Sequence, residues 1–185
     1  QEIIRRYFDA LNALAKGSTS EKEAQKIELL MNMAEITVTD RKVVIKALER
    51  AKETDGPAAA LELRDGRIIT GKTTNLLGAS AALLLNVLKV LAGIDHETHI
   101  ISPESIEPIQ KLKVDYLKSK NPRLHTAEVL IALSASAATN PQARLALSQL
   151  PELAGCQAHT SVMLSDVDIK IFKKLEVQLT SEAVY

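Results

Sequence analysis

The first 55 residues repeat apolar side chains with the period of an α-helix. Spacings of three and four, typical of one helical face, separate the apolar residues of the opening stretch: Ile3, Ile4, Tyr7, Phe8, Leu11 and Leu14. Gly17–Ser20 ends this helix, and Ser20 is well suited to cap a second one. Thr39 and Asp40 begin a third helix, which the turn-forming residues Thr54–Pro57 end. We therefore predict an all-helical segment over residues 1–56.

Beyond residue 56 the pattern changes to short β-prone runs that alternate with helices. Ala58–Arg64 and residues 67–70 flank Asp65-Gly66, a pair typical of tight turns, so a β-hairpin comes first. We predict later strands over residues 98–102, 158–164 and 175–179. Helices are predicted between them over residues 74–93, 103–118 (or from Pro108), 126–139 and 141–155, and again from Ser165.

Strands that alternate with helices indicate a mostly parallel sheet with helices on both faces. We therefore predict an α/β fold for residues 57–185: a three-layer α/β/α sandwich with a mixed sheet, in which a leading β-hairpin is followed by parallel strands. Composition allows this, because 46% of the 185 residues are hydrophobic. Only 3% are aromatic, so the core must be built from Leu, Ile, Val and Ala.

The one candidate for a membrane-spanning segment is Leu76–Ile94, because it is mostly apolar and almost long enough to cross a bilayer. Asn86 and Lys89 lie within it, and a lysine at the centre of a bilayer costs about 2.5–3.5 kcal/mol. These polar residues share one helical stripe with small ones, which favours a buried helix with one solvated edge. We predict a core helix and no membrane association.

Acidic and basic residues balance, with 23 of each. A nucleic-acid surface needs clustered Lys and Arg, so we expect no nucleic-acid partner. Cys156 is the single cysteine and forbids an internal disulfide, which fits a reducing compartment and predicts a cytoplasmic protein. The chain begins at Gln1, inside a helical pattern and without an initiator Met or a leader, so we expect it to be a piece of a longer protein.

Gly66–Thr73 fits the phosphate-loop pattern G-x-x-x-x-G-K-[ST] letter for letter. In a phosphate loop the backbone amides surround the phosphate, the lysine (here Lys72) contacts its oxygens and the hydroxyl of Thr73 holds Mg²⁺. The four variable positions, however, are Arg-Ile-Ile-Thr, which favour extended backbone. We favour a hairpin whose second strand contains both isoleucines, and keep the phosphate-binding loop as the alternative.

Two clusters are candidates for anion binding. The first lies where the hairpin meets a helix N-terminus, whose free backbone amides bind anions readily. The second is a basic turn before the next predicted helix, and its histidine is a candidate proton donor. Helix capping and complementing of a helix dipole explain the same residues without a ligand, and both explanations stay open. The candidates are Lys72, Thr73, Thr74, Lys120, Arg123, His125 and Thr126.

No metal site is predicted, because His96, His99 and His159 have no carboxylate or cysteine at a spacing that completes a zinc set. The signature of the zinc-dependent deaminases is absent, and so is the G-x-S-x-G elbow of the α/β-hydrolases. The sequence therefore assigns no catalytic residue, and whether the protein is an enzyme stays open.

Four segments nevertheless make the whole chain, from Gln1 to Tyr185, resemble a known family: QEIIRRYFDAL, ITGKTTNLLGASAALLLNVLK, SKNPRLHTAEVLIALSASAATNP and HTSVMLSDVDIKIFKKLEVQLTSE. They are similar to the carboxy-terminal part of a bacterial group, uncharacterised protein family 371. The resemblance implies a longer protein, with an amino-terminal region that carries its own glycine-rich, phosphate-loop-like segment and with a short tail beyond Tyr185. It also implies a topology similar to the cytidine-deaminase-like sandwich without its metal ligands, and it transfers no activity.

Two hypotheses for the function follow. The first is a structural and assembly domain at the carboxy terminus of a larger protein, with its own amino-terminal region as partner and with self-association into a homo-oligomer. The second is part of a nucleotide- or phosphometabolite-processing enzyme whose active site the amino-terminal region completes. Lys72, Thr73, Arg123 and His125 would then converge on a phosphate. We expect no cofactor in this fragment and, on the second hypothesis, a nucleotide in the full-length protein.

Overall fold

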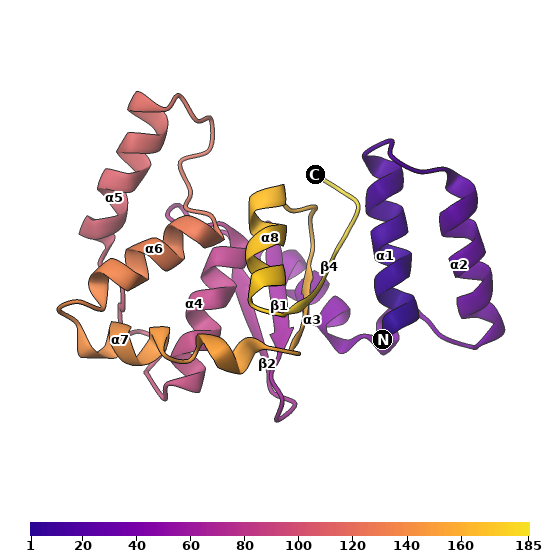
Figure 1. Cartoon of the computed structure of the whole chain (residues 1–185), viewed down its shortest axis with the longest axis horizontal. Helices are drawn as coiled ribbons and strands as arrows, with labels where there is room; N and C mark the ends of the chain where they lie inside the picture. The colour runs from indigo at the N-terminus through magenta and orange to yellow at the C-terminus, as the bar shows by residue number, and fades with distance from the viewer.

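The computed structural model describes all residues, 1–185. It contains eight α-helices around a sheet of four strands (Figure 1). The helices are α1 (Glu2–Ala15), α2 (Glu21–Met33), α3 (Lys42–Thr54), α4 (Ala79–Leu91), α5 (Pro103–Lys111), α6 (Thr126–Ser136), α7 (Pro141–Leu147) and α8 (Asp166–Lys174). The strands are β1 (Ala58–Glu62), β2 (Ile68–Lys72), β3 (Gln157–Thr160) and β4 (Gln178–Ser181). Three short helices lie between them: the 3₁₀ helices η1 (Val38–Asp40) and η3 (Leu150–Leu153), and η2 (Leu112–Tyr116), which has π-helical geometry.

The predicted hairpin is confirmed. β1 and β2 are antiparallel neighbours, with Leu61 opposite Ile69. The turn between them contains Gly66 at a φ of 85°, which glycine adopts without steric cost. The phosphate-loop pattern at Gly66–Thr73 is therefore a turn followed by a strand, because the residues between its two glycines continue into β2 and pair with β1.

The mixed sheet is also confirmed, but its parallel part is smaller than the alternation of elements predicted. The strand order is β2-β1-β3-β4, β1 and β3 are antiparallel, and only β3 and β4 are parallel. The strand predicted over residues 98–102 is wrong, since that segment forms bends and pairs with no strand. Ile100 and Ile101 are both buried. Two adjacent buried residues can lie in an irregular segment as well as in a strand, which explains the error.

Helices cover both faces of the sheet and make the predicted three layers. α3 packs on the face with Ala60 and Ile68, and α4 packs on the opposite face with Ala59 and Leu61. α4 is buried over most of its surface, which confirms the predicted core helix. A helix able to cross a bilayer would need more length and more apolar residues than any helix of this chain has.

α4 crosses β2 so closely that one position in the strand requires glycine. A Cβ atom added at Gly71 would lie 2.6 Å from the Cα atom of Leu83 and 2.8 Å from the carbonyl oxygen of Ala79. Both are backbone atoms of α4, so no side-chain rotation relieves the contact. The second glycine of the phosphate-loop pattern therefore serves the packing of strand against helix.

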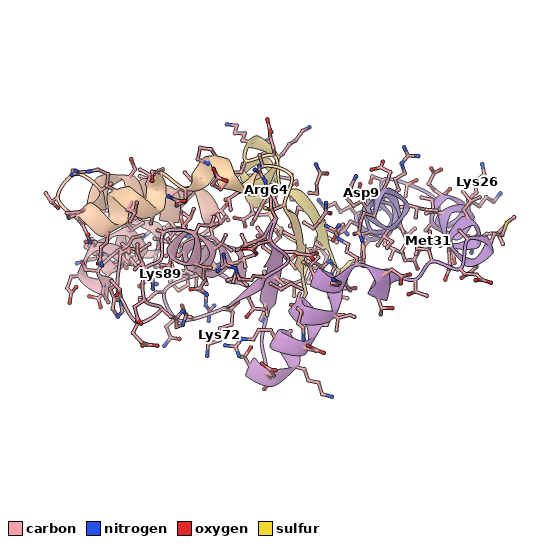
Figure 2. All side chains as sticks on the ribbon, turned by 90° about the horizontal axis from the view of Figure 1, so that it is seen from below. Asp9, Lys26, Met31, Arg64, Lys72 and Lys89 are labelled. Atoms are coloured by element: carbon pink, nitrogen blue, oxygen red, sulfur yellow. The ribbon has the colours of Figure 1, made fainter.

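The α1–α2 hairpin lies beside the sheet (Figure 1), and it shares a small hydrophobic core with the first turn of α3. The buried members of this core are Ile4, Phe8, Met31 and Val44. In Figure 2, the labelled Met31 points from α2 towards α1. α3 instead lies directly on the sheet. The division of the chain at residue 56 into a helical segment and a sandwich domain stays a prediction.

Arg41, which precedes α3, ties the helices to the sheet. It is only 1% exposed, and all five of its N–H groups donate hydrogen bonds. The acceptors are Oγ1 of Thr180, the side-chain oxygens of Gln1 and Gln157, and the carbonyl oxygens of Ala158 and Gln178. None of them is a carboxylate, and burial of the guanidinium lowers the pKa of Arg41 to about 10.

His159 extends this network on β3. Its Nδ1 lies 2.8 Å from Oγ1 of Thr180, and its Nε2 lies 3.1 Å from Oε1 of Glu182. Thr180 accepts from Arg41, and its single proton has two acceptors, Nδ1 at 2.8 Å and the carbonyl oxygen of Ala158 at 3.3 Å. With the proton on the shorter contact, the ring donates from Nε2 to Glu182. The ring also packs on Phe8, with 4.9 Å between centroids. Burial lowers the pKa of His159 and outweighs the opposing effect of Glu182.

The first prediction concerns Gly71. Gly71→Ala should lower the free energy of unfolding by about 1–3 kcal/mol, because α4 and β2 must separate to admit the methyl group. Urea unfolding measures this change. Gly56→Ala is the matched control, since an added Cβ there would lie no closer than 3.8 Å to any atom beyond its chain neighbours. This variant should stay within about 0.5 kcal/mol of the parent. Equal effects of the two substitutions would contradict the close packing.

The second prediction concerns pH. The folded protein binds a proton at His159 less readily than the unfolded chain, whose imidazole titrates near its ordinary pKa of 6.5. The contribution of His159 to stability is therefore fully present above that value and is lost as the pH falls through it, by up to about 1.4 kcal/mol per pH unit.

Urea unfolding at pH about 7.5 and about 5.5 tests this effect. The parent should lose more stability between the two conditions than His159→Gln, which cannot titrate there. Because all other groups titrate in both proteins, they cancel in the comparison. A parent and a variant that lose the same amount would show that protonation of His159 is not linked to unfolding.

Candidate functional site

The N-terminus of α4 opens into a cavity of about 230 Å³. We call it the helix-start cavity, and it lies between Gly78–Ala81, residues 121–125, and side chains from residues 160–168. Thr73 lines it from the end of the hairpin. Elements that are far apart in the sequence thus contribute to one small space on the α4 side of the sheet.

A short backbone bridge builds this cavity. Leu77 pairs with Leu124, and the N–H of Gly78 donates to the carbonyl oxygen of Leu124 at 3.0 Å. Oγ1 of Thr74 accepts from the N–H of Leu77 at 3.0 Å, which closes a turn before the helix. This turn explains why α4 begins at Ala79 and not near residue 74, as predicted. The bridge also places the start of α4 beside Leu124. The next residue, His125, is the N-cap residue of α6.

α4 begins without a capping side chain, because its N-cap residue is Gly78. The N–H of Ala82 donates to the carbonyl oxygen of Gly78. The three N–H groups before it, from Ala79 to Ala81, have no acceptor within the helix. Ser80 lines the cavity at 5% exposure, and its buried Oγ has no hydrogen-bond partner. The helix therefore brings three amides and one hydroxyl, all of them donors, to the same end of the cavity.

Arg123, which precedes the bridged residue Leu124, also lines the cavity. Its Nε donates to the carbonyl oxygen of Thr74 at 2.6 Å, which leaves the two terminal nitrogens of the guanidinium for other acceptors. Lys113, which is largely buried, holds the backbone here, since its Nζ donates to the carbonyl oxygen of Arg123 at 2.5 Å and to Glu128 at 2.8 Å. The position of Arg123 is thus fixed at both its backbone and its side chain.

His125 lies at the rim as the N-cap residue of α6. Its N–H donates to Oε2 of Glu128 at 3.1 Å, and its Nε2 lies 3.1 Å from Oε1 of the same carboxylate. Nδ1 is buried and has no hydrogen-bond partner. With Glu128 orienting the ring, His125 is able to hold or transfer a proton at the edge of the cavity.

Thr126 is engaged elsewhere. Its N–H and its hydroxyl donate to Oδ1 of Asp168, at 2.9 and 2.6 Å. The other oxygen of Asp168 accepts from the hydroxyl of Ser165 at 3.0 Å. Asp168 also lines the cavity, and these donors, together with the first turns of α6 and α8, compensate its negative charge. Thr126 therefore joins α6 to α8.

The structure divides the other six anion-binding candidates into three groups. Thr73, Arg123 and His125 line the helix-start cavity. Lys72 and Thr74 line a different cavity, on the other side of the same loop. Lys120 is exposed and lines neither. The expected convergence of Lys72 with His125 is therefore not found, because Lys72 belongs to β2 and successive residues of an extended chain point to opposite sides.

Sequence reasoning missed Ser80. The sequence did contain a signal for it, since Ser80 is the one polar residue in the apolar stretch Ala79–Leu85, and this stretch directly follows Gly78. A helix that starts at glycine has no side-chain cap, and a serine in its first turn is then a candidate ligand. For metals, no three His, Cys, Asp or Glu side chains lie close enough together to hold an ion.

Comparison with known proteins defines the class to which this mixed α/β chain belongs. The sequence profile of a family described as "Domain of unknown function DUF1846, C-terminal" matches residues 39–185. The chain is 56% identical to a UPF0371 protein of Corynebacterium aurimucosum and 55% identical to one of Corynebacterium efficiens. It is 46% identical to a UPF0371 protein of Streptococcus pyogenes serotype M5. Each alignment covers 185 residues, the whole of this chain and 37% of the relative.

The chain therefore belongs to the DUF1846 family of UPF0371 proteins, which confirms the resemblance to uncharacterised protein family 371. It spans 37% of the length of the curated relatives that it matches, and the family profile is that of the C-terminal domain. The names of these bacterial relatives state no activity, so the function has to be argued from the site.

Proposed function

We propose that this chain binds a small oxyanion, the phosphate group of a metabolite, in the helix-start cavity, as part of a larger protein. The observation that carries the proposal is the buried hydroxyl of Ser80, which has no partner and lies in the first turn of α4, beside three N–H groups without intrahelical acceptors. A buried polar group without a partner costs about 1–3 kcal/mol. An anion would accept hydrogen bonds from all four donors.

The electrostatics of the cavity support an anion over a neutral ligand. The N-terminus of a helix carries about half a positive charge, and α4 directs its own into the cavity. Arg123 adds a full positive charge, with its terminal nitrogens available for a planar or tetrahedral oxyanion. Asp168 is the one carboxylate in the lining, and its oxygens already accept three hydrogen bonds.

A phosphate-processing reaction is the form of the function that we favour. His125 at the rim would hold or deliver a proton, with Glu128 as its orienting partner. The remaining groups of an active site, a nucleotide among them, would come from the part of the longer relatives that this chain does not span. This proposal differs from the sequence hypothesis in its residues, because Ser80 enters the site and Lys72 leaves it.

The third prediction tests the cavity with inorganic phosphate. Titration into the protein, followed by the imidazole NMR signals of its four histidines, should shift His125 selectively. Ser80→Ala and Arg123→Gln should each weaken binding by about tenfold, which corresponds to the loss of one hydrogen bond to a charged group. Lys120→Gln, which removes a positive charge outside the cavity, is the matched control and should bind as the parent does.

Two results would contradict the proposal. The first is a weakening by Lys120→Gln equal to that by Arg123→Gln, because phosphate would then respond only to overall charge. The second is unchanged affinity in Ser80→Ala, because the hydroxyl that carries the argument would then make no contact with the anion.

An assembly role is the second candidate function, and the exposed face of α2 favours it. Leu29, Leu30 and Met33 are all exposed on this helix, Met33 to 75%. The only helix or strand with which α2 makes extensive contact is α1. The longer relatives offer a covalently attached partner for this face. We propose that the remainder of the larger protein covers it.

The fourth prediction is that amide hydrogen exchange in α2 slows when the longer protein replaces residues 1–185. Met33→Lys should abolish the added protection, since a buried charge would replace an apolar contact. Ile131→Lys, an equally drastic change at another exposed position, should leave it intact. Equal exchange rates in the short and long proteins would contradict the proposal that the remainder of the protein covers α2. Concentration-dependent dimers of residues 1–185 in sedimentation would instead show that a second copy of the chain covers this face.

A further inference from the structure

A second cavity lies at the free edge of β2. It has a volume of about 350 Å³ and is enclosed by Thr70–Thr74, by the outer side of α4 and by residues 96–106. We call it the strand-edge cavity. Its volume falls within the range of small-molecule sites, about 300–1000 Å³. The loop that carries Thr73 and Thr74 separates it from the helix-start cavity, since Thr74 lines the former and Thr73 the latter.

The charged side chains that line this cavity all have one sign. Arg50, Lys72 and Lys89 contribute cations, His96 and His99 contribute imidazoles, and no Asp or Glu takes part. Acidic and basic residues are equal in number over the whole chain, so the lining is locally basic, and the acids nearest to Lys89, which are Asp95 and Glu97, lie outside it. Figure 2 shows Lys72 and Lys89 on one side of the molecule, opposite the side on which Arg64 lies.

Intramolecular contacts compensate this charge only in part. One terminal nitrogen of Arg50 lies 3.1 Å from a carboxylate oxygen of Glu53, but Nε of Arg50 is buried and has no partner. Nζ of Lys89 donates to the carbonyl oxygen of His96 at 2.7 Å, which uses one of its three protons. Lys72 takes part in no ion pair within 4.0 Å. Donors are therefore available on several sides of the cavity.

The floor of the cavity is apolar. Leu85, Ile100, Ile101 and Ile106 line it, together with Ala82. Asn86 also lines the cavity, and its side chain donates to the carbonyl oxygen of Thr70 at 2.9 Å and so occupies the free edge of β2. A cavity lined by apolar side chains and by cations from three different elements matches a ligand that has both an apolar body and an anionic group.

We propose that the strand-edge cavity binds an amphipathic anion, a carboxylate or a phosphate monoester with a hydrocarbon or aromatic body. The apolar body lies against the isoleucines of the floor, and the anionic group lies among Arg50, Lys72 and Lys89. This site is independent of the helix-start cavity, where the proposed ligand is the phosphate group alone.

The two sites can be tested in one experiment, because different histidines report on them. His96 and His99 line the strand-edge cavity, His125 lines the helix-start cavity, and His159 is fully buried and serves as an internal control. Octyl phosphate, octanoate, octanol and inorganic phosphate are titrated separately into the protein. The imidazole NMR signals of the four histidines are followed.

Octyl phosphate or octanoate should shift His96 and His99, and the one with the higher affinity identifies the anionic group. Octanol should bind at least about tenfold more weakly, because it lacks the charge. Inorganic phosphate should leave these two signals in place whether or not it shifts His125, so failure of one site is distinguishable from failure of the other. Lys72→Gln should weaken binding of the amphipathic anion by about tenfold, and Lys120→Gln should leave the affinity for this anion unchanged.

Three results would overturn the proposal. Octanol that binds as tightly as the two anions would show that the cations play no part. His96 and His99 signals that neither amphiphile moves would show that no ligand of this class enters. Affinity unchanged in Lys72→Gln, and also in Lys89→Gln, would place the anionic group outside this cavity.

Discussion

The complete hydrogen bonding of one buried guanidinium is the constraint on which the arrangement of layers depends. Arg41 has no carboxylate partner, so its charge is stabilised by five neutral oxygens, of which four come from β3 and β4. A buried charge that loses its partners costs several kcal/mol. Each acceptor is therefore held where Arg41 needs it, and the parallel β3–β4 pair, the start of α3 and the first residue of the chain are fixed in one cluster.

This cluster also determines what β3 presents on its other face. His159 points towards Arg41, Thr180 and Phe8, and the alternation of side chains along a strand then directs Ala158 and Thr160 to the opposite side. Ala158 belongs to the core under α4, and Thr160 lines the helix-start cavity. A polar network on one face of the sheet thus sets the register of the strand that contributes to the cavity on the other.

Local sequence patterns predicted the helices, the hairpin and three residues of the helix-start cavity, because periodicity, turn formers and helix ends are properties of neighbouring residues. These patterns failed where the structure of a residue is determined by segments far away in the sequence. Nothing near Arg41 in the sequence indicates that its five acceptors lie at Gln1 and beyond residue 156. The run at residues 98–102 was read as a strand because burial of Ile100 and Ile101 does not reveal whether a pairing partner exists. Ser80 was missed because its significance depends on the bridge between Leu77 and Leu124.

The loop between the two cavities explains why arginine stands at position 123. Its Nε holds the carbonyl oxygen of Thr74 and so fixes the loop that the cavities share. The terminal nitrogens of the same planar group remain for the anion that we propose in the helix-start cavity, which would then bind without releasing the loop. A lysine would concentrate its protons on one nitrogen, and the anion would compete with Thr74 for that atom. A side chain that donates to the carbonyl oxygen of Thr74 and to the proposed anion at the same time therefore has to be a guanidinium, whose donors are spread over three nitrogen atoms.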